Sequence, residues 1–496
     1  MKKIKNIELK EKRGILHSTI QLNMTNVLNN IHDGDNMKNS NKVLIFSLFL
    51  VLFIGLSAVS AADADDVIAS DANPDSGNLK AIDVKDNSDA SSDIVSSANE
   101  EILADSGDTV APISFSDLQS KVRSSSKINL DSDVTFKSGD SKGGIMIAKS
   151  VTINGNGHTI DAKGKTRVFK VAGTLTLTNV NIINGYMAGE NGGAILNSGT
   201  LKLTNCNFKN CKVTGSKISG GAIAGAGGGN IVNCKFIKCS APNLGGAVYS
   251  NKLKFNKCDF TSNTAGCGGA IGGKAYIYNS NFKNCKSTKT KSTASKTDGG
   301  GACSGEFPRV EGCTFTNCKA TNGGLGGAIR GTTNTYNCKF INCAAKEGGA
   351  IRGKGTTVGC TFEKCFATSK MGGAIFTEKT TINKCKFIEC SAKKSHAGAV
   401  YVGNNAKITN CKFTGCSAPK GFGGAVYGNG VVVKCTFNKN KANGGGAVSS
   451  YSLTVKSSTF TANSAYKGGA AYNVKSIVSC KFSKNKATYG NNVYRG

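Results

Sequence analysis

The sequence lacks tryptophan and has four histidines in 496 residues. Acidic residues are also scarce in most of the chain, with 14 aspartates and glutamates between residues 109 and 496. Glycoside hydrolysis needs two carboxyl groups that flank the scissile bond, and calcium-dependent lyases need clustered acids. The one close acidic pair here is Asp131 with Asp133, whereas Glu363 and Glu389 occupy different places in neighbouring repeats. These absences argue against an enzyme, although a polysaccharide lyase or glycoside hydrolase remains an alternative.

Motifs for cofactors and metals are missing too. The sequence shows no Ser-His-Asp, Cys-His or glycine-rich nucleotide pattern, and it lacks the aspartates of calcium-binding β-roll repeats. His396 is the only histidine within the repeats described below, so zinc sites built from cysteine and histidine are not favoured. We therefore expect no cofactor, no metal site and no catalytic residue.

Charge is spread unevenly along the chain. The formal net charge is +31, but residues 63–108 carry −11 and residues 109–496 carry +38. Such a basic body favours anionic partners such as acidic polysaccharide, lipid headgroups or nucleic acid. Alternatively, the lysines keep a repetitive sheet protein soluble and protect its edges. Residues 63–108 are rich in Asp, Ser and Ala, and we predict that they form a disordered acidic linker.

A single long apolar run occurs near the N-terminus. It spans 14 residues, 43–56, follows Lys38 and Lys42, and is followed by small residues. This order is typical of a signal peptide, which we place at residues 37–62. The run is short for a membrane span, so an uncleaved membrane anchor is the alternative. Residues 1–36 do not suit a signal peptide, and we interpret them as a misassigned or dispensable extension.

From residue 192 onward, one pattern returns every 22 to 32 residues. Each copy opens with Gly-Gly-Ala-Ile/Val and closes with Cys-x-Phe-x-x-Cys or Cys-x-Phe-x-x-Asn, as in 245–263, GGAVYSNKLKFNKCDFTSN. The copies alternate apolar and polar residues and lack a helical period, which excludes ankyrin and tetratricopeptide repeats, and they are too short for propeller blades. We therefore predict an all-β fold, a single-stranded right-handed parallel β-helix (solenoid) over residues 146–496.

The segment 109–145 is predicted to be an N-terminal cap. The sequence Ser116-Asp-Leu-Gln119 matches a capping box, and Leu118 and Val122 share one face of the helix that would follow. Such an amphipathic helix would cover the first exposed edge of the solenoid.

These motifs resemble known surface proteins. The pairing of GGA[IV] with FxxN is similar to the repeat of chlamydial polymorphic outer-membrane proteins. The combination of a signal peptide, an acidic spacer, SVTINGNGHTID (150–161) and GGAI/CxFxxC repeats resembles adhesin-like proteins of methanogenic archaea. The resemblance covers 113–496 and implies a secreted or wall-associated adhesin. The sequence shows no autotransporter barrel or wall-binding repeat, so the mode of attachment is open.

All twenty cysteines lie between Cys206 and Cys480. Seven pairs have the spacing Cys-x4-Cys and are the candidates for disulfide bonds: Cys206/Cys211, Cys234/Cys239, Cys313/Cys318, Cys338/Cys343, Cys360/Cys365, Cys385/Cys390 and Cys411/Cys416. In other copies Asn replaces the second cysteine, which indicates a bend whose side chains stack between turns. Bridging within a pair, bridging between turns and buried free thiols all remain possible.

Binding residues are expected directly after each Gly-Gly-Ala-Ile/Val, because the strand period turns that position outward. One turn apart, Arg330 and Arg352 would stack as like charges, which a bound anion would relieve. Beside them, Phe376, Tyr401 and Tyr427 would form an aromatic strip on which sugars can stack. The alternative is that these rings only stack on one another.

The insertion 286–299 is a second binding candidate. It is a basic loop rich in Ser and Thr, and it contains Lys286, Lys289 and Lys291. Such a loop on a rigid scaffold suits contact with an anionic surface, or it is a tolerated insertion.

The sequence thus predicts a secreted or cell-surface, non-catalytic, adhesin-like protein. Its expected partner is an extracellular glycan or cell-wall polymer, preferably anionic. Export and the lack of an aromatic–basic motif argue against nucleic acid, and a membrane would be met only through an uncleaved signal segment. A structural envelope or matrix component is a further alternative, and the oligomeric state is open.

Overall fold

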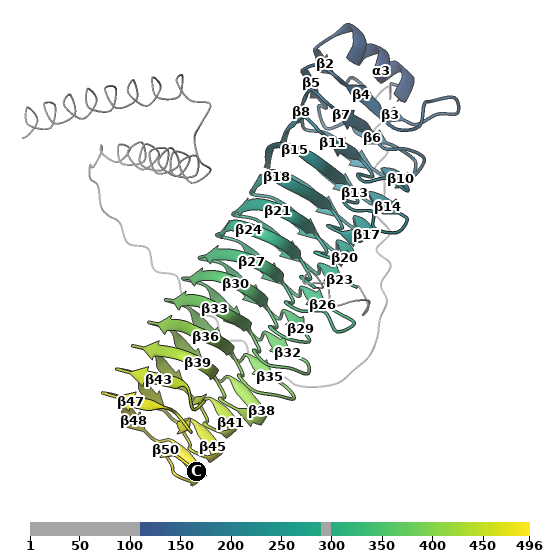
Figure 1. The fold of residues 1–496 in the computed structure, drawn as a ribbon. Helices are drawn as coiled ribbons and strands as arrows, with labels where there is room; N and C mark the ends of the chain where they lie inside the picture. The colour runs from purple at the N-terminus through teal and green to yellow at the C-terminus, as the bar shows by residue number, and fades with distance from the viewer. Residues whose placement is uncertain (1–109, 289–298) are drawn as a thin grey trace, which may run out of the picture. The chain divides into compact units, whose positions relative to one another are not determined.

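From residue 181 onward, each turn of the chain contributes to all three parallel sheets, and the turns stack into a solenoid (Figure 1). This computed structural model describes residues 110–288 and 299–496. Within them the only α-helix, α3 (Phe115–Ser124), lies at the N-terminal end of the stack (Figure 1). The predicted all-β parallel β-helix with a capping helix is confirmed.

Sheet A holds the Cys-x-Phe signature. Its sixteen short strands are β1 (Ile113–Ser114), β3 (Val134–Thr135), β6 (Thr159–Asp161), β9 (Asn181–Ile183), β13 (Asn207–Lys209), β16 (Lys235–Ile237), β19 (Asp259–Thr261), β22 (Asn281–Lys283), β25 (Thr314–Thr316), β28 (Lys339–Ile341), β31 (Thr361–Glu363), β34 (Lys386–Ile388), β37 (Lys412–Thr414), β40 (Thr436–Asn438), β44 (Thr459–Thr461) and β48 (Lys481–Ser483).

Sheet B follows the Gly-Gly-Ala turn and has the longest strands. They are β2 (Lys127–Asn129), β4 (Ile145–Ile147), β5 (Val151–Asn154), β7 (Phe169–Val171), β8 (Thr174–Thr178), β11 (Ile195–Asn197), β12 (Thr200–Thr204), β15 (Ile223–Val232), β18 (Val248–Asn256), β21 (Ile271–Tyr278), β24 (Cys303–Glu311), β27 (Ile329–Tyr336), β30 (Ile351–Val358), β33 (Ile375–Asn383), β36 (Val400–Thr409), β39 (Val426–Val433), β42 (Val448–Ser449), β43 (Leu453–Lys456), β46 (Ala471–Tyr472), β47 (Ser476–Val478) and β50 (Val493–Tyr494).

Sheet C closes each turn before the next pair of glycines. Its thirteen strands are β10 (Tyr186–Ala188), β14 (Lys212–Thr214), β17 (Ser240–Leu244), β20 (Thr264–Cys267), β23 (Lys286–Ser287), β26 (Lys319–Ala320), β29 (Ala344–Ala345), β32 (Phe366–Ala367), β35 (Ser391–Ala392), β38 (Ser417–Phe422), β41 (Lys441–Gly444), β45 (Ser464–Lys467) and β49 (Lys486–Tyr489).

The two glycines of the repeat meet two separate demands of the turn from sheet C to sheet B. Gly245, the first glycine of its copy, has φ +62°, a left-handed conformation that glycine adopts without steric cost. A Cβ on the second, Gly246, would collide with the carbonyl oxygens of Gly269 and Thr264 in the next turn. The alanine and the aliphatic residue that follow, Ala247 and Val248, are fully buried.

The interior is organised as rows of identical side chains. Twelve phenylalanines of sheet A stack face to face from Phe208 to Phe482, with ring centroids 4.6–5.1 Å apart. The strands bring them into register, as in the pairing of Phe236 with Phe260. Stacked aromatic pairs add about 1 kcal/mol beyond the burial of their area, so this row stabilises the contact between every pair of turns.

The capping helix begins two residues earlier than the sequence pattern suggested. Ser114 is the N-cap: its hydroxyl accepts the Asp117 N–H at 3.0 Å, and its own N–H donates to the Asp117 carboxylate at 2.8 Å. The expected cap, Ser116, instead donates its N–H and hydroxyl to Asp140 at 2.9 and 2.7 Å. Starting the helix at Phe115 adds that ring to the buried face of Leu118 and Val122, as the capping-box match did not foresee.

The extension, signal peptide and acidic linker predicted for residues 1–108 lie outside the described residues. Within the described part, no helix has both the length and the apolar composition that crossing a membrane requires.

Candidate functional site

A hollow of about 410 Å³ lies on the outer face of sheet B, across four consecutive turns. We call it the glycine groove. Its floor is backbone, and its lining residues are Asn251, Gly273, Lys274, Ser304, Gly305, Glu306, Arg330, Gly331 and Thr332. Strand register brings these residues together, because Ser304 pairs with Arg330, Gly305 with Gly331, and Lys274 with Glu306.

The floor of the glycine groove requires glycine. Gly305 and Gly331 have φ values of +143° and +130°. A Cβ on Gly305 would collide with the carbonyl oxygen of Gly273, and one on Gly331 with that of Gly305. The strands of this sheet also change register just beyond these residues, for example between Lys274 and Tyr276. The missing side chains leave an open channel of peptide groups between two rows of side chains.

The walls of the glycine groove carry both signs of charge. Lys274 and Glu306 form an ion pair of 3.2 Å with 47% and 63% of their side chains exposed, so solvent weakens it and both groups can exchange it for a ligand. Arg330 lies on the other wall, and its guanidinium donates to the carbonyl oxygen of Arg352 at 3.3 Å. Arg330, predicted as a binding residue, therefore lines a hollow together with a second cation.

Arg352, predicted to share an anion with Arg330, has protein carboxylates around it. The two arginines do pair in register. However, the Nε of Arg352 lies 2.5 Å from the carboxylate of Glu347, which is 8% exposed, and its Nη2 lies 3.1 Å from Glu378. These carboxylates supply the compensation that we had assigned to a bound anion. Arg352 is thus held by structural contacts and is absent from the lining of the groove.

The predicted aromatic strip is stacked on itself. One face of Phe376 lies under the Arg352 guanidinium at 4.1 Å, and the other faces Tyr401 with 4.3 Å between ring centroids. Phe376 is 9% exposed, so a sugar cannot stack on either face of its ring. Tyr427 stacks on His396 at 4.8 Å, and Tyr401 and Tyr427 are partly exposed. Sugar binding by these two tyrosines stays a prediction.

The basic insertion is described only in part. Lys286 is exposed at the start of β23 and pairs in register with Lys319 of the next turn. Lys289 and Lys291 lie outside the described residues.

The acids considered for catalysis each face a lysine. Glu363 lies 3.7 Å from Lys339, and Glu389 lies 3.9 Å from Lys364. Among the described residues, no three histidines, cysteines or acids converge as a metal site would require.

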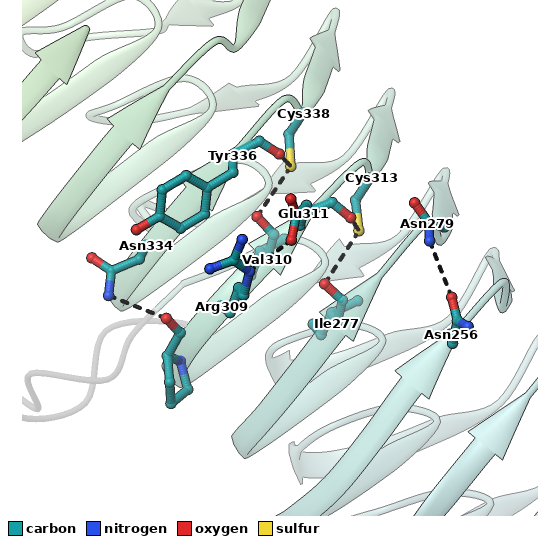
Figure 2. Close-up of polar contacts among 11 residues, drawn as sticks. Asn256, Ile277, Asn279, Arg309, Val310, Glu311, Cys313, Asn334, Tyr336 and Cys338 are labelled. Carbon is teal, nitrogen blue, oxygen red and sulfur yellow. Dashed lines mark hydrogen bonds and ion pairs between the residues drawn. The ribbon is translucent and has the colours of Figure 1, made fainter. Parts of the chain in front are cut away.

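Eighteen of the twenty cysteines form two interior rows, one at each end of the sheet A strands, whereas Cys267 lies in β20 of sheet C and Cys303 lies in β24 of sheet B. All twenty are free thiols, and all but Cys480 are buried. Figure 2 shows Cys313 and Cys338 donating to carbonyl oxygens of the preceding turn, Ile277 at 3.7 Å and Val310 at 3.4 Å. The sulfur also accepts, because the N–H of Cys338 lies 3.4 Å from the sulfur of Cys360 in the next turn. These positions therefore favour a small side chain that can donate and accept, and Val180, which precedes β9 as Cys206 precedes β13, shows that an apolar side chain is also accommodated.

Bridging within a Cys-x4-Cys pair, one of the three possibilities for these thiols, does not fit the structure. Cys206 and Cys211 flank strand β13, whose extended residues alone hold the two Cα atoms about 10 Å apart, beyond the reach of a disulfide. Each thiol instead donates to backbone carbonyls, that of Cys211 to Lys209 at 3.6 Å and to Ile182 at 3.9 Å. The same correction holds for the other six pairs, whose members are also free thiols on either side of a strand: Cys234/Cys239, Cys313/Cys318, Cys338/Cys343, Cys360/Cys365, Cys385/Cys390 and Cys411/Cys416.

Serine and asparagine fill the same positions when cysteine is absent. The N–H of Cys258 donates to the Ser280 hydroxyl at 3.0 Å, and that of Cys416 donates to the Asn440 side chain at 2.9 Å. Asn440 in turn donates to Asn463 at 2.9 Å, so the expected stacking at this bend is present. This exchange explains why Cys and Asn alternate in the repeat.

Burial keeps several of these thiols protonated. It raises the pKa of Cys258 to about 12 and that of Cys303 well above its usual value. Such thiols are poor nucleophiles, so Cys258 serves packing and hydrogen bonding and Cys303 serves packing. The contact between Cys206 N and the sulfur of Cys234, 3.4 Å, shows that sulfurs of neighbouring turns approach one another's backbone. Disulfide bonding between turns under oxidising conditions stays a prediction.

The site contains residues that the sequence interpretation missed. Lys274 and Glu306 line the groove with Arg330, and Glu347 and Glu378 pair with Arg352, but none of the four was predicted as part of a site. One signal was readable, because a third glycine follows Gly-Gly-Ala-Ile/Val-x in several copies, as at Gly331.

Two family models match parts of this chain. One is described as "Right handed beta helix region" and matches residues 349–496; the other, "Putative pectate lyase-like adhesive domain", matches residues 121–219. The chain is a right-handed β-helix repeat protein. Both matches fit an adhesin-like or polysaccharide-related β-helix protein. Neither bears on the resemblance to archaeal and chlamydial proteins, which stays a prediction.

Other comparisons add little. No curated protein matches the sequence. One solved structure that the comparison matches is the A-module of the mannuronan C-5 epimerase AlgE4 from Azotobacter vinelandii, which is 10% identical. The match covers 72% of this chain and 91% of that module at a TM-score of 0.23, too low to bear on function.

Proposed function

We propose that this β-helix protein is a secreted or surface-displayed adhesin that binds acidic glycans in the glycine groove without chemical turnover. The observation that carries the proposal is the hollow of about 410 Å³, floored by peptide groups and walled by side chains from four turns. Arg330 and Lys274 supply positive charge for a carboxylate, while Asn251 and Ser304 supply neutral polar groups for hydroxyls. The match to an adhesive-domain model supports the same function.

A binding role suits the groove better than catalysis. Its lining contains a single carboxylate, Glu306, which is already paired with Lys274. Hydrolysis of a glycosidic bond normally needs two carboxyl groups on opposite sides of that bond. A rigid groove with exposed ion-pair partners can instead exchange one partner for an anionic sugar.

The test is a glycan array followed by calorimetry on the best ligand. The double variant Lys274→Gln/Arg330→Gln should weaken binding of acidic glycans by more than about tenfold, because each charge-assisted contact adds more than 1 kcal/mol or so. The matched control is Lys354→Gln/Arg309→Gln, which removes two cations of the same sheet that do not line the hollow.

Equal affinity of the wild type and the groove variant would exclude the glycine groove as the site. Chromatography of the incubated glycan tests the absence of turnover, and shortened or unsaturated products would show that the protein is an enzyme. Arg352 is left unchanged in this test, because its replacement would also expose a buried ion pair.

A further inference from the structure

The last fifth of the chain is basic without any acidic residue. Residues 390–496 contain fourteen lysines and one arginine but no aspartate or glutamate. The preceding turns carry acids that offset their lysines, for example Glu389, whose carboxylate lies 3.9 Å from Lys364. The change falls within a regular stack of turns, so it is a property of the surface and leaves the fold unchanged.

Strand register gathers six of these lysines along sheet A and the adjoining start of the sheet C strands, a surface that we call the basic face. Three lie in and around β40, namely Lys434, Lys439 and Lys441; three lie in and around β48, namely Lys481, Lys484 and Lys486. All six are exposed, and no carboxylate among the described residues lies within ion-pair distance of them. The charge on this face is therefore not neutralised by the described part of the protein.

At the positions in register with these lysines, the turn between the two groups presents small neutral side chains, and its own lysines, Lys456 and Lys467, lie at the ends of β43 and β45. Thr459 lies in register between Thr436 and Lys481, and Ser464 lies between Lys441 and Lys486. Lysines two turns apart are separated by about 10 Å, since neighbouring strands are about 4.8 Å apart. This spacing reduces repulsion between the lysines and leaves a polar strip of low relief flanked by positive charge on both sides.

These features fit a flexible linear polyanion. Lysine ammonium groups attract anions as point charges without the paired geometry that arginine imposes, and the face contains no arginine. The phenylalanine rings of this surface offer little area to nucleic-acid bases, because Phe437 of β40 and Phe460 of β44 are fully buried and Phe482 of β48 is partly buried and stacks on Phe460 at 5.1 Å. The exposed rings of sheet C, Tyr466 and Tyr489, pack edge to face against each other at 5.2 Å. Positive charge on both sides of a neutral strip suits a chain that carries carboxylates at regular intervals.

We propose that the basic face binds a linear acidic polysaccharide, such as a polyuronate, and attaches the protein to an extracellular polymer. This second surface lies on sheets A and C near the C-terminus, whereas the glycine groove lies on sheet B. Recognition and attachment then use different residues and can be tested separately.

The experiment measures binding of the full chain to immobilised polygalacturonate at rising salt concentration. The basic-face variant replaces the six lysines by glutamine. The control variant also replaces six exposed lysines by glutamine, at Lys127, Lys142, Lys165, Lys170, Lys202 and Lys252. Both variants lower the net charge equally, so a difference between them reports on position. Circular dichroism confirms that each variant is folded.

We expect rising salt to weaken the binding of polygalacturonate by the wild type. The affinity should fall by more than about tenfold in the basic-face variant and by less than about threefold in the control variant. Equal losses in both variants would show that net charge alone drives binding and would overturn the proposal. Loss in Lys274→Gln/Arg330→Gln but not in the basic-face variant would assign the polymer to the groove. Tighter binding of duplex DNA or anionic vesicles by the same face would exclude polysaccharide as its ligand.

Discussion

Arg352 is held on the outer surface of the β-helix by two carboxylates and an aromatic ring. Its side chain is 14% exposed and contacts Glu347, Glu378 and the face of Phe376. Glu347 is more deeply buried than its partner and has one further cation nearby, Lys370 at 4.0 Å. A carboxylate in that environment depends on the arginine, because solvent cannot replace it fully.

Replacing Arg352 with alanine should therefore lower the free energy of unfolding by about 3 kcal/mol, since it leaves Glu347 buried without its main partner. Arg309→Ala is the control, because the pair of Arg309 with Glu311 is short, 2.6 Å, but its side chains are 46% and 32% exposed. In the Arg309→Ala variant the free energy of unfolding should fall by less than about 1 kcal/mol. Urea denaturation measures both, and equal losses would contradict a structural role for Arg352.

His396 gives the fold a dependence on pH. Burial lowers the pKa of its imidazole below the ordinary value of 6.5. The ring stacks with both Phe422 and Tyr427, and its Nδ1 accepts the N–H of Phe422 at 2.9 Å. Accepting this bond requires an unprotonated Nδ1, so the folded state favours the neutral form.

Because the folded-state pKa is the lower one, the unfolded chain binds the proton more readily. The stabilisation of the fold by neutral His396 is complete above pH 6.5. It is lost as the pH falls from 6.5 through the pKa that His396 has in the folded state. We expect the melting temperature to be lower at about pH 5 than at about pH 7.5. The difference should be smaller in the His396→Gln variant. The same shift in both proteins would show that other groups cause the pH dependence.

At the scale of elements, the capping helix is fastened by one carboxylate. Asp140 accepts the N–H groups of Phe115, Ser116 and Lys137 at 3.2, 2.9 and 2.7 Å. Burial opposes its charge, yet hydrogen bonds from Ser116, Lys137 and Phe115 lower its pKa below the ordinary value. The carboxylate thus ties the start of α3 to the loop that precedes β4.

Asp140→Asn should release the start of the helix. The donors from Phe115, Ser116 and Lys137 share two carboxylate oxygens in the wild type, whereas the asparagine amide has one acceptor oxygen. We expect the free energy of unfolding to fall by about 1 kcal/mol. Amide exchange should become faster in α3, with a smaller change in sheet A. Hydrogen exchange followed by mass spectrometry resolves the two elements. Uniform faster exchange along the whole solenoid would contradict a local role for this contact. Asp131→Asn, at an exposed acid of the same region, is the control.

The interior rows were predictable from the sequence, whereas the outer contacts were not. Aligned copies reveal that Phe236 and Phe260 must lie above one another, since parallel turns in register stack equivalent positions. The contact of Glu347 with Arg352 crosses the Gly-Gly-Ala turn, and its closeness depends on the curvature of that turn. The glycine groove depends on the backbone angles of Gly305 and Gly331. The sequence shows that these positions are glycine but does not show which angles they adopt.

At the scale of the whole molecule, each turn is stabilised mainly by the two turns next to it. The phenylalanine row, the asparagine contacts and all three sheets repeat the same pairings from one turn to the next. Stability of such a stack is approximately a sum over turns and over the contacts between neighbours. Deletion of a complete turn should therefore be tolerated if the turns that it brings together have equivalent residues at equivalent positions. Deletion of part of a turn should not be tolerated.

Deletion of 446–468 removes one complete turn and joins Gly445 to Gly469. Ala471 then takes the place of Val448, with which it pairs in register, and Asn485 replaces Asn463 as the partner of Asn440. We expect an unchanged β-sheet spectrum by circular dichroism and a melting temperature within about 5 °C of the wild type. Deletion of 446–457 removes about half a turn and would bring strands of different sheets together, so buried and exposed faces no longer match. Proteolysis should then digest the chain beyond that point, and equal resistance of the two deletions would contradict a stability that depends on register between turns.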